Sequence, residues 1–153
     1  MAARGARGGG RVTESGGYRP YQYVTLRCVP RVEREEFVNV GVVLHCPDAD
    51  FLGVLSAVDE DRVRALDAEV DIASVTAALA AIEKVCRGEA HSDFGVGVRA
   101  TAYGSRAARD DASTRFGFLK APRSTVLQPG PVHGGVTADP QATLEHLLAT
   151  LVR

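Results

Sequence analysis

Two dense clusters of polar residues are the candidates for chemistry in this sequence. The first spans residues 27–39, RCVPRVEREEFVN, and its charged and amide side chains are Arg27, Arg31, Glu33, Arg34, Glu35, Glu36 and Asn39. The second spans residues 121–135, APRSTVLQPGPVHGG, with polar side chains at Arg123, Ser124, Thr125, Gln128 and His133. Guanidinium, hydroxyl and amide groups donate hydrogen bonds to phosphates and carboxylates, and histidine exchanges a proton near neutral pH. Both clusters therefore predict an anion site.

Each cluster also has a purely structural interpretation. The first can be a solvated turn whose arginines and glutamates pair with each other and contribute little. In the second, proline and glycine can simply shape a turn, with His133 bonded to backbone. Arg27 and Asn39 are the strongest functional candidates of the first cluster, because both point away from the apolar side of their predicted strands.

Several familiar kinds of site have no signature in this sequence. His45, His91, His133 and His146 lie in unrelated contexts, without HExxH, HxxxH or a Cys pair, so no metal is expected. Neither GxxxxGK[ST] nor a strand-GxGxxG-helix unit occurs, and a GxSxG elbow is also missing. We therefore predict no cofactor.

The first cluster is expected to lie on a β-hairpin. Alternation in residues 21–29 places Val24, Leu26 and Cys28 on one face of a half-buried strand. The run FVNVGVVLHC predicts a central strand with period-two apolar positions at Val38, Val40, Val42 and Leu44. The short charged turn between the strands favours antiparallel pairing, and residues 51–57 predict a third strand.

Three helices are predicted from their caps and apolar spacing. Asp59 begins a short helix, and Asp71 begins a stronger one in which apolar residues recur at steps of three and four until Gly88. Asp139 followed by Pro140 begins the last helix, whose leucines form one stripe.

The remaining segments give weaker patterns. Residues 88–112 predict a long surface connection, with a poor strand over 96–102. Residues 116–119 and 125–128 predict two further short strands around the turn KAPRS, and PGPVHGG is expected to be a loop. Residues 1–19 predict a disordered tail rich in glycine and arginine. The whole indicates a single α+β domain over residues 20–153, with a mainly antiparallel sheet of about five strands and two or three helices.

Length, charge and cysteine content narrow the function classes. A chain of 153 residues is the size of one domain. Its formal net charge of −1 makes nucleic acid an unlikely partner, although an arginine-rich face or tail keeps that interpretation as a third alternative. Three cysteines without CxxC spacing indicate reduced thiols in the cytoplasm, and no apolar run is long enough for a membrane span.

The segments YQYVTLRCVPRVEREEFVNVGVVLHCP and FLKAPRSTVLQPGPVHGG resemble the bacterial domain-of-unknown-function family DUF3037 from about residue 21 to 153. Matching positions are Arg27, Pro30, Arg34, Glu36, Phe37, Asn39, Gly41, Arg123, Ser124, Gln128 and His133. The resemblance implies a stand-alone bacterial protein without an assigned activity. It also hints at association with a HipA-like kinase. The tail and residues 98–112 lie outside the shared pattern.

Two function classes follow from these observations. The first is an accessory or binding subunit that partners a HipA-like kinase or binds an anionic ligand through Arg27, Arg34, Asn39, Arg123, Ser124 and Gln128. The second is an enzyme acting on a phosphate-containing or nucleic-acid substrate. In that enzyme Arg123 and Ser124 would bind the anion, His133 would serve as general acid or base, and Glu36 would assist it, which requires Glu36 and His133 to share one site.

Overall fold

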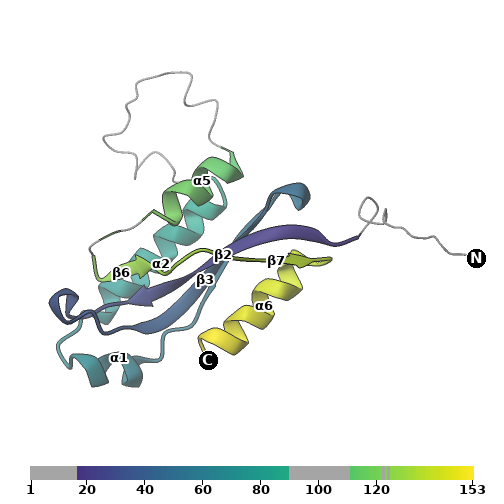
Figure 1. Cartoon of the computed structure of the whole chain (residues 1–153). Coiled ribbons are helices and arrows are strands. Elements are labelled where there is room, and N and C mark those ends of the chain that lie inside the picture. Colours follow the sequence, from purple (N-terminus) through teal and green to yellow (C-terminus); the bar gives the residue numbers. More distant parts are fainter. Residues whose placement is uncertain (1–16, 90–110, 122, 124) are drawn as a thin grey trace, which may run out of the picture.

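The computed structural model describes residues 17–89, 111–121, 123 and 125–153. They form an α+β domain with a five-stranded antiparallel sheet and four α-helices (Figure 1). The strands are β2 (Arg19–Cys28), β3 (Val38–Cys46), β4 (Phe51–Ser56), β6 (Leu127–Pro129) and β7 (His133–Thr137). The helices are α1 (Glu60–Leu66), α2 (Ile72–Cys86), α5 (Ala112–Leu119) and α6 (Pro140–Leu151), with two 3-10 turns, η2 (Val32–Arg34) and η3 (Pro47–Ala49).

The predicted β2–β3 hairpin is confirmed, and β3 pairs in turn with β4. The opposite edge of β2 is shared by two short strands: β6 pairs near the end of β2 at Cys28, and β7 pairs near its start at Arg19. Between them Gly130 donates its backbone N–H to the carbonyl of Thr25 at 2.8 Å. Strands β6 and β7 thus act as one interrupted edge strand, and Figure 1 shows them in line along β2.

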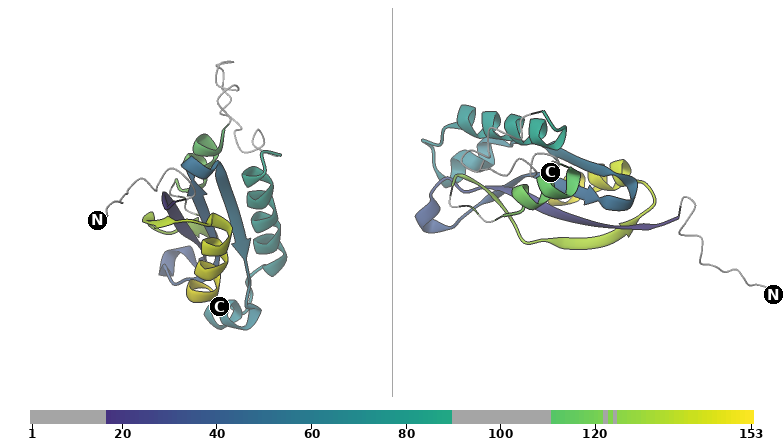
Figure 2. Two further views of the ribbon diagram at one scale, coloured as in Figure 1. Left: turned by 90° about the vertical axis from the view of Figure 1, so that its right-hand side faces the viewer. Right: turned by 90° about the horizontal axis from the view of Figure 1, so that it is seen from above.

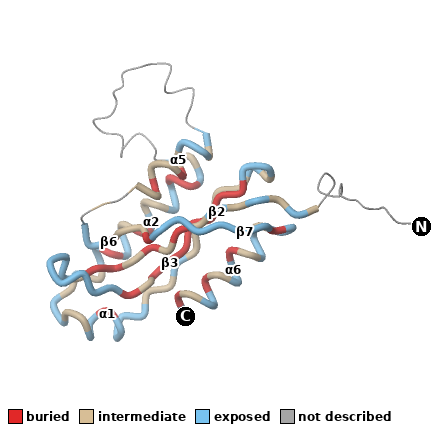
Figure 3. The backbone as a smooth tube through the Cα atoms, viewed as in Figure 1, coloured by how far each residue is buried: buried red, intermediate tan, exposed pale blue. Residues whose placement is uncertain are grey.

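Helices cover both faces of the sheet, and Figure 2 shows α2 and α6 on opposite sides. One core lies beneath α2 and α5 and includes Val24, Leu26 and Cys28, as predicted for β2. The other lies beneath α6 and includes Val42, Leu44 and Cys46. Strand β3 is therefore buried on both faces over most of its length (Figure 3).

The prediction of one continuous apolar face on β3 was wrong. The pairing register shifts between Leu26, opposite Gly41, and Arg27, opposite Asn39, which leaves Val40 as a bulged residue. A bulge inverts the alternation beyond it. Val38 and Val40 consequently face α2 and α5, whereas Val42 and Leu44 face α6.

The three predicted helices are confirmed at their caps. The carboxylates of Asp59, Asp71 and Asp139 each accept a hydrogen bond from the backbone N–H three residues later, at 3.1–3.2 Å. After α2, Gly88 adopts a positive φ of 77°, a conformation that glycine accommodates without strain. The apolar stripe of α6 packs into the core through Leu144 and Leu148.

Residues 116–119, predicted as a strand, belong instead to helix α5, which Asp111 caps by accepting a hydrogen bond from Thr114 N at 2.9 Å. The loop predicted over PGPVHGG also needs correction, since His133–Thr137 is strand β7. The strand predicted over 125–128 begins later, at Leu127. Arg19, at the end of the predicted tail, belongs to β2. Residues 1–16 of the tail lie outside the described part of the chain. Residues 90–110, which include the poor strand predicted over 96–102, lie outside it as well.

In the described residues, no helix is long and apolar enough to cross a membrane.

Candidate functional site

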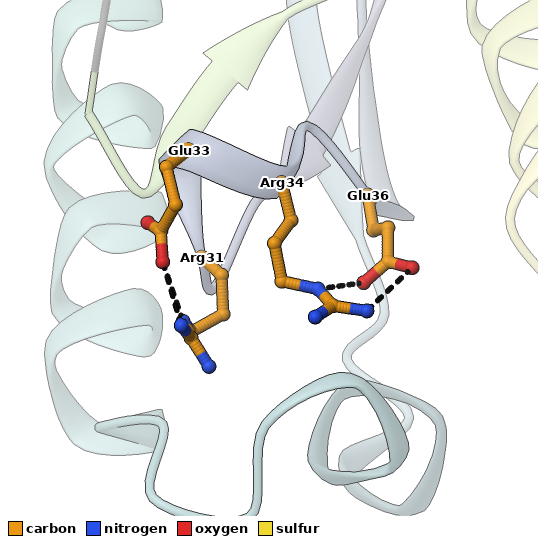
Figure 4. A network of polar contacts seen from close by, with 4 residues as sticks. All are labelled: Arg31, Glu33, Arg34 and Glu36. Carbon is orange, nitrogen blue, oxygen red and sulfur yellow. Dashed lines mark hydrogen bonds and ion pairs between the residues drawn. The ribbon is translucent and has the colours of Figure 1, made fainter.

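The charged turn of the β2–β3 hairpin forms two separate ion pairs (Figure 4). Arg31 pairs with Glu33 at 2.7 Å, and Arg34 pairs with Glu36 at 2.9 Å. All four side chains are exposed to solvent. The hydrogen bond from Arg34, followed by the attraction of its charge, lowers the pKa of Glu36 below its ordinary value. Arg34 and Glu36 therefore satisfy each other, as in the structural interpretation of this turn.

Arg27, Asn39 and Gln128 come together on the α6 side of the sheet. Their strands are adjacent, and the register places Arg27 opposite Asn39 on β3 and opposite Gln128 on β6. Helix α6 packs against β3 and β4 on this side. The tertiary fold thus joins residues from both sequence clusters, which lie about ninety residues apart.

The Arg27 side chain is held between an aromatic ring and a glycine. Its guanidinium carbon lies 4.0 Å from the centroid of the Phe37 ring, a cation–π contact. On the other side, a Cβ atom at Gly130 would lie 3.0 Å from Arg27 Nε and 2.7 Å from the hydroxyl of Thr25. A side chain at position 130 would therefore force Thr25 or Arg27 to shift.

Arg27 has no ionic partner within the described residues, unlike Arg31 and Arg34. Its Nε is buried and makes no hydrogen bond. A buried donor without a partner costs about 1–3 kcal/mol, more where the group is charged. Among the arginines of the first cluster, Arg27 is therefore the one whose side chain is not engaged in an ion pair within the described residues.

Asn39 has a structural role that the sequence did not indicate. Its side-chain amide donates to the carbonyl of Leu151 at 3.1 Å and so satisfies a carbonyl in the last turn of α6. Arg62 does the same for the carbonyl of Val152 at 3.0 Å. The side-chain oxygen of Asn39 is buried and unpartnered, so an unused acceptor lies one strand away from the unused donor of Arg27. We call Arg27, Phe37, Asn39, Gln128 and Gly130 the Arg27 site.

His133 lies further along the same face. It is opposite Tyr23 in the register, and the two rings stack with centroids 5.2 Å apart. Glu36 lies beyond the other end of β2, where Cys28 pairs with Val38. Tyr23 and Cys28 are five residues apart, about 17 Å along an extended strand. The fold therefore does not bring the carboxylate of Glu36 to His133.

Arg123 lies on the opposite face of the sheet from Arg27. Its guanidinium donates to the carbonyl of Phe118 at 2.8 Å and lies 4.4 Å from the ring centroid of the same residue. Ser124 lies outside the described residues. The predicted set of anion-binding residues is thus divided, with Arg27, Asn39 and Gln128 on one face and Arg123 on the other.

Sequence reasoning missed two features that shape the Arg27 face. Gly130 was assigned only to a turn, although a Cβ atom there would crowd the side chains of Thr25 and Arg27. Tyr23 stacks on His133 but was not considered a partner for it. The alternation of Tyr21, Tyr23, Thr25 and Arg27 was the available signal, because these four residues share one face.

Metal binding finds no support in the described residues, which contain no group of three or more His, Cys, Asp or Glu side chains able to hold an ion. His45 is buried and packs against the ring of Phe116, with centroids 5.2 Å apart.

Comparison with known proteins identifies the family of this chain but no activity. No curated protein matches the chain, and no solved structure does. The model of a family described as protein of unknown function, DUF3037, matches residues 23–152. That span includes both polar clusters, the whole Arg27 site and nearly all of the sheet. The chain therefore belongs to the DUF3037 family of proteins of unknown function.

Proposed function

We propose that this protein is a binding domain that holds an anionic ligand at the Arg27 site. The observation that carries the proposal is the Arg27 guanidinium, which lies between Phe37 and Gly130 with a buried Nε that has no partner. An arginine in this position attracts a phosphate or carboxylate, whose oxygens accept from its fixed donors.

The neighbouring groups narrow the chemistry of the ligand. Arg27 Nε and Asn39 Oδ1 are both closed off from solvent, so a ligand would meet the terminal N–H groups of the guanidinium, which are donors only. The Gln128 amide nitrogen already donates to the Thr125 carbonyl at 2.8 Å, which fixes its orientation. A phosphate or a carboxylate supplies the acceptor oxygens that these guanidinium donors need.

The proposal is tested by calorimetric titration with inorganic phosphate, pyrophosphate, AMP and citrate at low ionic strength. At least one of these anions is expected to bind the wild-type protein and to lose affinity by tenfold or more in Arg27→Gln, since a hydrogen bond to a charged group contributes about 1.5–3 kcal/mol. Gly130→Ala retains the charge but displaces the side chain, so a comparable loss is expected.

Arg31→Gln is the matched control. Arg31 lies on the same hairpin, is exposed and already pairs with Glu33, so its removal is expected to leave the affinity unchanged. The proposal fails if none of the four anions binds, or if Arg31→Gln weakens binding as much as Arg27→Gln.

We also propose that the protein is an accessory subunit that associates with a HipA-like kinase. We propose that it does so in the cytoplasm. The resemblance to the DUF3037 family supports the association with a kinase. The three cysteines support a reducing compartment, because all are buried and unpaired. Affinity purification of the tagged protein from its host, followed by mass spectrometry, tests the association. A stoichiometric kinase is expected, and a protein that purifies alone would contradict it.

The enzyme alternative retains less support from the geometry. It needs His133 and Glu36 in one site, whereas Glu36 pairs with Arg34 at the far end of the hairpin. A catalytic role for His133 would have to use Tyr23, its stacking partner, in place of that carboxylate.

A further inference from the structure

A second site candidate lies on the opposite face of the sheet from Arg27. A pocket of about 240 Å³ opens between α2, α5 and β6. Its lining is mainly aliphatic and aromatic, with Leu26, Ala78, Ala81, Ile82, Phe118, Leu119, Leu127 and Pro129. Sites for drug-sized molecules occupy roughly 300–1,000 Å³, so this pocket suits a smaller ligand.

The hollow exists because α2 presents two small side chains to it. Ala78 and Ala81 are three residues apart, so they lie on the same face of the helix. Both are partly buried, whereas Ala80 of the same helix is exposed. A larger side chain at 78 or 81 would occupy the pocket, and the same change at 80 would point into solvent.

Among the polar residues that line the pocket, Arg123 has N–H donors that its hydrogen bond to Phe118 does not use. The other two polar lining side chains are already engaged: the Thr125 hydroxyl donates to the Leu127 carbonyl at 2.8 Å, and Gln128 donates to the Thr125 carbonyl. A guanidinium has five N–H donors, and a hydrogen bond to the Phe118 carbonyl uses one of those on Arg123. The guanidinium carbon lies 4.4 Å from the centroid of the Phe118 ring, a cation–π contact that restrains its position. No carboxylate of the described residues pairs with this guanidinium.

We propose that this pocket binds a small carboxylic acid with an apolar body, whose carboxylate pairs with Arg123 and whose hydrocarbon fills the space beside Ala78 and Ala81. The planar fork of arginine matches the two oxygens of a carboxylate. Burial of the hydrocarbon against the aliphatic walls supplies the remaining affinity. Gln128 borders both this pocket and the Arg27 site, but Arg123, Ala78 and Ala81 belong to the pocket alone. The proposal therefore does not depend on the function proposed at the Arg27 site.

The test is an NMR titration of the full-length protein with sodium hexanoate and with 1-hexanol, which differ in charge but little in hydrocarbon length. Hexanoate is expected to shift the methyl signals of the pocket residues saturably and to bind about tenfold more tightly than hexanol, the contribution of one hydrogen bond to a charged group. Arg123→Gln is expected to remove this preference. Ala81→Leu is expected to weaken hexanoate at least tenfold while Arg123 remains, and Ala78→Leu provides an independent filling variant.

Ala80→Leu is the matched control, because it adds the same side chain to the exposed side of the same helix. It is expected to leave hexanoate affinity unchanged, as is Arg27→Gln, which removes the other proposed site. The proposal is overturned if hexanoate does not bind saturably or binds no better than hexanol. It is also overturned if neither filling variant weakens binding, or if Ala80→Leu weakens it equally.

Discussion

Four arginines of the two polar clusters, all in the described part of the chain, separate into two groups according to what surrounds the guanidinium. Arg31 and Arg34 are exposed and each has a glutamate two residues along the chain, so sequence neighbours satisfy them. Arg27 and Arg123 have no such neighbour, and each guanidinium instead lies over an aromatic ring. An arginine that stacks on a ring and lacks a carboxylate keeps its donors available for a ligand, which is why both proposals rest on these two residues.

His45 supports a prediction at the residue scale. Burial lowers the pKa of His45 below its ordinary value of 6.5, and the positive charge of Lys120 lowers it further. Below about pH 6.5 the unfolded chain takes up a proton that the folded protein resists, so folding stability is expected to fall as the solution is acidified. Urea unfolding at pH 7.5, 6.5 and 5.5 measures this loss.

The variants His45→Leu and His146→Gln separate the cause from other acid effects. His45→Leu removes the buried imidazole, so the loss of stability between pH 6.5 and 5.5 is expected to become smaller. His146 is exposed on α6, and His146→Gln is expected to retain the wild-type profile. Equal slopes in wild type and His45→Leu would show that His45 is not responsible.

At the scale of elements, α5 shows why a short apolar run is ambiguous. The segment FGFL is too short for its apolar spacing to distinguish a strand from a helix, and it was assigned to a strand. The decisive signal lies upstream, where Asp111 accepts from Thr114 N and starts a helix. Phe116 and Leu119 then fall three residues apart and are buried together beneath α5.

The cap of α5 can be tested directly. Asp111→Ala removes the acceptor and is expected to destabilise the protein by about 1 kcal/mol, within the 0.5–2 kcal/mol typical of N-caps. Asp111→Asn keeps an acceptor in the same place and is expected to cost much less. Chemical denaturation of the three proteins measures both values, and indistinguishable stabilities for Ala and Asn would argue against the cap.

The interrupted edge strand formed by β6 and β7 shows why the glycine-rich segment was difficult to assign from the sequence. The two strands contact the same edge of β2, and Gly130 between them lets Arg27 lie across the break. Further along, a Cβ atom at Gly135 would lie 2.7 Å from the Tyr21 hydroxyl. Gly135, one of the glycines that suggested a loop, is therefore a strand position over which the long side chain of Tyr21 lies.

At the scale of the whole molecule, two cores share one strand. Strand β3 contributes Val43 to the core under α2 and α5, and Leu44 to the core under α6. Neither side of the sheet can lose its packing without exposing residues of the same strand. We therefore expect the domain to unfold in one cooperative transition.

Leu144→Ala tests this coupling. Leu144 is 1% exposed, and its truncation is expected to cost about 2–5 kcal/mol. Because unfolding is cooperative, amide hydrogen exchange should accelerate in α2, on the opposite face, as well as in α6. Thr150→Ala, at an exposed position of α6, is the control and is expected to change neither. Acceleration confined to α6 would show that the two cores unfold independently.

The sequence by itself determined the elements with strong local signals: the β2–β3 hairpin, strand β4, the capped helices α1, α2 and α6, and the family. Caps and periodicity are properties of a few adjacent residues, so they can be read without the fold. Tertiary structure decided the rest, because the relevant contacts join distant residues. The bulge at Val40 divides the strand between two cores, and strand pairing places Arg27 beside Gln128 while it leaves Arg123 on the other face.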